Sequence, residues 1–131
     1  MMHLKQPMDP ERWIAFANQF SREHDGWAAS LEVREAGSPL RTEVGDSLFR
    51  GLTFEERDGH NTLVFTFGDE PEEHFAHIVH EPLAIASAET NDHAGASLVV
   101  DTAALGRCIL ALWNPMHEEE RTYAHSGRND R

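Results

Sequence analysis

A change of hydrophobic period at Gly26 constrains the fold of this chain more than any other feature. Upstream of it, apolar residues recur at i, i+3, i+4 and i+7, as on one face of an α-helix: Trp13, Phe16, Ala17 and Phe20. Downstream of it, apolar residues alternate with other residues, as in a strand with one wet face: Trp27, Ala29, Leu31 and Val33. A helix that leads directly into a sheet predicts the α+β class.

The start of the helix is marked by local signals. Asp9 can accept hydrogen bonds from free amides, Pro10 suits the first helical position, and Glu11 complements the helix dipole. Gly26 is placed to end the helix soon after His24. These signals predict an amphipathic helix over residues 10–24.

The remainder of the domain reads as short strands separated by turn residues. Asp58-Gly59 separates two apolar runs, 51–56 and 62–67, and this pattern predicts a hairpin. Other strands are predicted at 27–33, 40–44, 75–80, 83–88, 97–101 and 107–113. The expected fold is an N-terminal amphipathic helix packed on a mainly antiparallel sheet, or on a small barrel, of about eight short strands.

The length of 131 residues suits one hydrophobic core. We expect residues 1–9 to be a flexible N-terminus, residues 10–113 to form a single α+β domain, and residues 114–131 to be a polar, loosely ordered tail.

The charge of the chain excludes one class of ligand. Twenty-three acidic residues against eleven basic ones give a formal charge of −12, whereas contact with nucleic-acid phosphates needs clustered Lys and Arg. No window approaches the roughly 20 apolar residues of a membrane span, and the N-terminus has no signal-like apolar segment. We expect a cytoplasmic protein that binds neither nucleic acid nor membrane.

Three evenly spaced histidines, His74, His77 and His80, are the candidate metal ligands of the sequence. A zinc ion needs ligands that converge at about 2.0–2.1 Å for nitrogen. In a strand, His74 and His80 lie roughly 20 Å apart and His77 points to the opposite face. Pro82 and the β-branched Ile78 favour a strand here, so we expect no metal site from these three residues.

No other motif predicts catalysis or a cofactor. The chain has no G-x-S-x-G elbow and no glycine-rich phosphate loop, and its single cysteine, Cys108, lies in an apolar run that predicts a buried thiol. Further metal ligands would have to come from distant residues, which are His60, His93, His117 and Glu118 to Glu120. We expect no cofactor and no catalytic residue, although nine histidines allow adventitious binding of zinc or nickel.

The order of these features resembles that of a family of short bacterial domains of unknown function. The resemblance covers residues 12–115 and includes the Trp-bearing helix, the strand "SLEV", the hairpin "RGLTFEERDGHNTLVFTF" and the segment "HIVHEP". Its most specific element is His77 with Ile78, Val79 and Pro82, whereas Ala76 stands where the family usually has Asp. The resemblance implies an order of elements and no reaction.

Three functions are compatible with the sequence. The leading hypothesis is a non-enzymatic module that binds a protein partner or associates with itself, through an edge strand or an exposed apolar face. The first alternative is a histidine-based metal or small-ligand binding protein. The second is an acidic inhibitor or nucleic-acid mimic, since a compact acidic domain can occupy a basic protein surface.

Overall fold

A short 3-10 turn, η1 (Pro10–Arg12), leads into helix α1 (Trp13–His24), as the sequence predicts. The computed structural model describes residues 7–115. Gly26 follows the helix with φ 90°, a left-handed conformation that glycine adopts without steric cost, so the chain can turn sharply into the first strand.

Within the described residues 7–115, seven strands form one antiparallel sheet in the order β4-β3-β2-β1-β7-β6-β5. Their bounds are β1 (Ala28–Arg34), β2 (Arg41–Arg57), β3 (His60–Phe67), β4 (Phe75–His80), β5 (Pro82–Glu89), β6 (Gly95–Thr102) and β7 (Arg107–Trp113). A 3-10 turn, η2 (Pro71–Glu73), precedes β4. The predicted hairpin is the β2–β3 pair, and both residues at its turn, Asp58 and Gly59, have positive φ.

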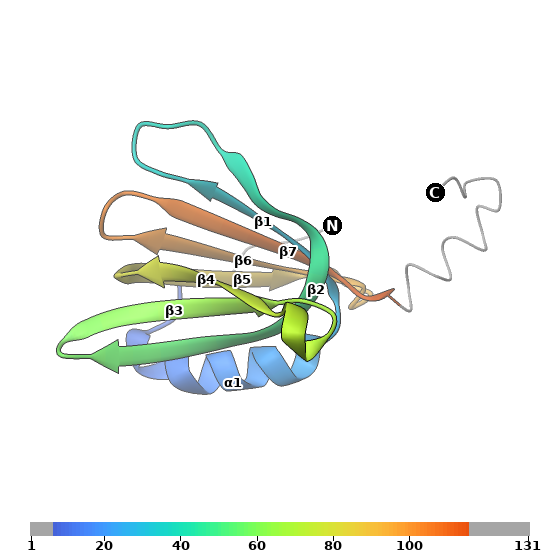
Figure 1. Cartoon of the computed structure of the whole chain (residues 1–131). Helices are drawn as coiled ribbons and strands as arrows, with labels where there is room; N and C mark the ends of the chain where they lie inside the picture. Colours follow the sequence, from blue (N-terminus) through green and yellow to red (C-terminus); the bar gives the residue numbers. More distant parts are fainter. Residues whose placement is uncertain (1–6, 116–131) are drawn as a thin grey trace.

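The expected count of about eight strands is wrong because two predicted strands, 40–44 and 51–56, belong to the single strand β2. The register of β2 slips by one residue at three places, two facing β1 and one facing β3. Such bulges bend a strand without ending it. The first half of β2 therefore pairs with β1 and the second half with β3, and Figure 1 shows the strand curving between these two parts of the sheet.

The sheet curls but does not close, so the small barrel considered from the sequence does not form. β4 and β5 lie at opposite ends of the strand order, and Glu81 alone joins them in the chain. Glu81 has φ 52°, donates its amide to Asn61 O at 2.9 Å and accepts a hydrogen bond from Ala103 N at 2.9 Å. The chain therefore turns at Glu81 from one edge strand to the other, and β4 and β5 form no strand pair with each other.

Helix α1 packs against the second half of β2 and shares one hydrophobic core with the inner face of the sheet (Figure 1). Phe20 meets Phe49 edge to face with centroids 5.7 Å apart, and Trp13 meets Phe54 at 5.3 Å. Ser21 Oγ also accepts a hydrogen bond from Leu52 N at 2.7 Å, which fixes the helix along the strand.

The ends of the domain are only partly within the described residues. Met8 N donates to Ile85 O at 3.1 Å, and Asn114 N donates to Ala94 O at 2.8 Å. Residues 1–6 and 116–131 lie outside the described residues, so the expectation of a flexible N-terminus and a loosely ordered tail stays a prediction there. No helix among residues 7–115 is long and apolar enough to cross a membrane.

Candidate functional site

The three histidines singled out in the sequence do not come together. His74 precedes β4, whereas His77 and His80 lie within it. His77 stands opposite Phe65, which is fully buried, and so points toward the core, while His80, three residues on, points to the other face. Among residues 7–115, the group of three side chains of metal-ligating type that does converge lies elsewhere and contains none of these histidines.

His77 has a charged neighbour of its own at the inner face of the sheet. Its Nδ1 lies 3.8 Å from Glu43 Oε2, and Glu43 Oε1 also lies 3.3 Å from Arg41 NH2. Burial lowers the pKa of His77 below its ordinary value of 6.5, Glu43 opposes this by raising the pKa, and Arg41 lowers it further. His77 therefore favours the neutral form in the folded protein.

This lowered pKa makes the stability of the fold depend on pH. The unfolded chain protonates His77 at a higher pH than the folded chain, so the contribution of His77 to stability is complete above 6.5 and declines as the pH falls toward the folded pKa. We expect His77→Gln, which cannot be protonated, to lose less free energy of unfolding than the wild type between about pH 8 and about pH 5 in urea titrations. His80→Gln, exposed on the same strand, should retain the wild-type pH dependence. Equal slopes in the wild type and His77→Gln would contradict the assignment.

Cys108 is buried, as its apolar setting predicts, and lies 4% exposed on β7. Burial, and next the negative charge of Glu43, raises the pKa of its thiol to about 11. A thiol with such a pKa stays protonated at neutral pH and is a poor nucleophile. The cysteine therefore acts as a small apolar side chain of the core.

In the part of the chain that the structure describes, the outer edge of β4 is open and apolar. Among residues 7–115, β4 pairs with β3 alone, and its sequence FAHIVH has no charged side chain apart from histidine. Phe75 is 46% exposed and Ile78 is 51% exposed, and Leu83 follows on the far side of the Glu81 corner at 62%. β5, the other edge strand, accepts a hydrogen bond from Met8 N at Ile85 O. The edge of β4 lacks the lysine, proline or bulge that protects the edges of natural sheets.

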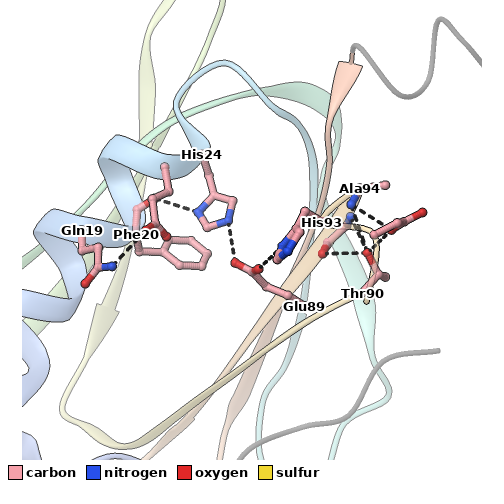
Figure 2. Close-up of polar contacts among 10 residues, drawn as sticks. Gln19, Phe20, His24, Glu89, Thr90, His93 and Ala94 are labelled. Carbon is pink, nitrogen blue, oxygen red and sulfur yellow. Dashed lines mark hydrogen bonds and ion pairs between the residues drawn. The ribbon is translucent and has the colours of Figure 1, made fainter.

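A groove of about 650 Å³ lies between helix α1 and the end of β5. The helix contributes both buried and exposed side chains, and the sheet contributes the end of β5 with the following loop. The lining residues are Phe16, Gln19, Phe20, Glu23, Ser87, Ala88, Glu89, Thr90, Asn91 and His93. Figure 2 shows the imidazole of His24 reaching from the helix toward Glu89, with His93 on the other side of that carboxylate.

His24 is a buried polar side chain that no motif in the sequence indicates. The residue is 1% exposed, and among residues 7–115 it is the polar or charged residue that is buried. In the sequence it is the last residue of the predicted helix. Histidine is a polar residue type of intermediate burial, so the identity of His24 alone does not predict a buried side chain. A helical count would have placed it four residues after Phe20 and thus on the apolar face, which is the signal that could have found it.

Comparison with known proteins identifies the family to which the chain belongs. No curated protein and no solved structure matches the chain. One family model, described as a family of unknown function (DUF5335), matches residues 4–121, which is most of the chain. The resemblance seen in the sequence is thereby confirmed, and the chain belongs to the DUF5335 family.

Proposed function

We propose that this domain is an interaction module that associates with a second copy of itself by antiparallel pairing of their β4 strands. The observation that supports it is the open edge of β4, uncharged and with Ile78 half exposed, in a chain of formal charge −12. Unpaired backbone groups on such an edge are a template for another strand. Pairing with a second copy satisfies them and covers Ile78 at the same time.

Symmetry selects the register of this pairing. A two-fold axis perpendicular to the sheet keeps the inner faces of both copies on one side, so each residue must stand opposite a residue of the same face. Centred on Ile78, the pairing sets Ile78 against its own copy and Ala76 against His80 on the outer face. His77 then stands opposite Val79 on the inner face. This register buries the exposed isoleucine as a cross-strand apolar pair, which stabilises a sheet by about 0.2–1 kcal/mol.

The charges near the strand make the association depend on salt. Glu72 and Glu73 precede β4 and Glu81 follows it, so antiparallel pairing brings acidic residues of the two copies together at each end. The Debye length shrinks from about 10 Å at 0.1 M to about 3 Å at 1 M salt. The dimer should therefore become stronger as the ionic strength rises, in contrast to an interface between opposite charges.

Replacing Ile78 with arginine tests the interface. We expect the wild-type chain to be dimeric at high protein concentration and high salt in light scattering coupled to gel filtration, and Ile78→Arg to be monomeric. Ile78→Arg removes the apolar pair and sets two like charges opposite each other. Hydrogen exchange should show that β4 amides lose protection in the variant while those of β1 and β7 do not.

Ile14→Arg is the matched control, because Ile14 is 59% exposed on helix α1, away from β4. It makes the same chemical change and should leave the dimer intact. A wild-type chain that stays monomeric at high salt, or an equal loss of the dimer in Ile14→Arg, would overturn the proposal.

A further inference from the structure

Three potential metal ligands meet where helix α1 ends beside strand β5. They are Glu23 and His24 from the last turn of the helix and Glu89 from the last residue of the strand. One ligand atom from each side chain lies within 4.8 Å of the ligand atoms of the other two. Among residues 7–115, these are the histidine, cysteine, aspartate or glutamate side chains that converge this closely in a group of three or more. The group is mixed, with a buried imidazole between two exposed carboxylates.

The imidazole of His24 is held in one orientation and one tautomer. Its Nδ1 lies 2.8 Å from the carbonyl oxygen of Phe20, and since a carbonyl only accepts hydrogen bonds, Nδ1 carries the proton. The ring is also packed between Phe20, with centroids 4.2 Å apart, and Trp27, at 4.6 Å. A backbone carbonyl bound to Nδ1–H is the usual outer partner of a metal-binding histidine, because it leaves the Nε2 lone pair free to coordinate.

Nε2 of His24 is directed at the carboxylates (Figure 2). It lies 3.4 Å from Glu89 Oε2, which is longer than the usual N–H···O distance of about 2.9–3.0 Å. Glu89 Oε1 lies 3.3 Å from Nδ1 of His93, and Glu23 Oε2 accepts a 2.9 Å hydrogen bond from Gln19 Nε2. Both carboxylates therefore have neighbours that hold them beside the imidazole.

The spacing matches what a small metal ion needs. Ligand atoms at about 2.0–2.1 Å from a tetrahedral ion lie roughly 3.3 Å from one another. The present atoms, all within 4.8 Å, reach that spacing by small rotations of the Glu23 and Glu89 side chains, both of which are exposed. The imidazole of His24 is already held in place, so it is the ligand that would not have to move when an ion binds.

We propose that Glu23, His24 and Glu89 form a binding site for a first-row divalent transition metal ion, with Zn²⁺ as the representative. Two carboxylates neutralise a dication, and the imidazole selects zinc-like ions over Mg²⁺ and Ca²⁺, which prefer oxygen ligands alone. His93, 80% exposed on the loop after β5, has its Nδ1 3.3 Å from Glu89 Oε1 and would orient that carboxylate from outside the set of three ligands. The ion would link the end of helix α1 to the edge strand β5.

The site lies in the wall of the groove between α1 and β5, since Glu23, Glu89 and His93 are among the groove's lining residues. An ion held by three protein ligands keeps a coordination position for water or a small anion. Here that position faces a space of about 650 Å³ that opens to solvent, so it is accessible to a small molecule.

Calorimetric titration of the full chain with Zn²⁺ tests the site. We expect one tight binding event per wild-type chain, and binding weaker by about tenfold or more in Glu89→Gln and in Glu23→Gln. Both changes keep the shape of an exposed side chain, so the variants should fold normally by circular dichroism. X-ray absorption of the bound zinc should show nitrogen and oxygen ligands and no sulfur.

His60 and Glu81 supply the matched control, because they form an exposed His–Glu pair with Nδ1 2.9 Å from Oε2. His60→Gln and Glu81→Gln should bind zinc as the wild type does. No binding at millimolar Zn²⁺, equal affinity in the wild type, Glu23→Gln and Glu89→Gln, or an equal loss in the control pair, would assign zinc to adventitious surface histidines and overturn the proposal. The Ile78→Arg variant should bind zinc normally, which separates this test from that of the dimer.

Discussion

Phe49→Ala is expected to lower the free energy of unfolding by about 3–5 kcal/mol, the cost of emptying a large buried aromatic site. Phe49 is fully buried and lies where β2 bends. Its ring meets Phe20 of helix α1 edge to face at 5.7 Å and Phe67 of β3 at 6.3 Å. Removing the ring leaves a cavity between the helix and the sheet, because neither the helix nor the bent strand can collapse independently into the space.

Urea denaturation at neutral pH measures the loss, with an unchanged slope as evidence that the native state stays compact. Phe75→Ala is the control, since Phe75 is stacked on Phe67 at 5.6 Å but 46% exposed at the edge of the sheet. Its loss should be about 1 kcal/mol. Losses of similar size in the two variants would mean that the bend of β2 does not anchor the core.

Gly68→Ala is expected to cost about 3 kcal/mol or more and to release β4 from the sheet. Gly68 directly follows β3 and has φ 131°, in a region that glycine alone adopts readily. A Cβ there would lie 2.8 Å from the carbonyl oxygen of Glu73 and 2.8 Å from the Cα of His74, both backbone atoms. The glycine is also pinned, because its N–H donates to Leu48 O at 2.9 Å and its carbonyl accepts from Arg50 Nε at 2.8 Å. The clash can therefore be relieved only by moving the segment that leads into β4.

Gly59→Ala separates the clash from backbone strain. Gly59 also has positive φ, at 78°, but nothing lies within 4 Å of a Cβ added there. Its cost should be about 1 kcal/mol, the strain of a left-handed residue alone. The loss of hydrogen-exchange protection in β4 should appear in Gly68→Ala and not in Gly59→Ala. If the two variants lose equal stability, the close approach at Gly68 does not control the placement of β4.

Local signals account for the parts of the fold that the sequence predicted well. Pro10 starts the helical segment and Gly26 follows its end, and Asp58-Gly59 marks the β2–β3 hairpin, because helix starts, turns and left-handed conformations depend on a few adjacent residues. The expected side-chain cap from Asp9 was wrong, since Asp9 makes no such hydrogen bond. The division of β2 failed for the opposite reason. Gly45-Asp46 reads as the end of a strand, but its neighbours β1 and β3 continue the pairing across bulges that local sequence does not reveal.

The candidate sites divide in the same way. The alternation of a single strand predicts that His77 and His80 point to opposite faces, and the pairing of β4 with β3 places them so. Glu43 beside His77 could not be predicted, since it comes from a different strand. The same holds for Glu89 beside His24, which are far apart in the chain and meet only when α1 has packed on the sheet with its last turn beside the end of β5.

The sequence by itself determined the class of the fold, the bounds of the helix, the central hairpin and the burial of Cys108. Each of these follows from short-range periodicity or from turn chemistry. Only the tertiary structure decided that, in the described part of the chain, β4 is an edge of an open sheet, and that Glu23, His24 and Glu89 meet. Strand order and the contacts of distant side chains depend on how the whole chain packs, and one sequence holds no local signal for them.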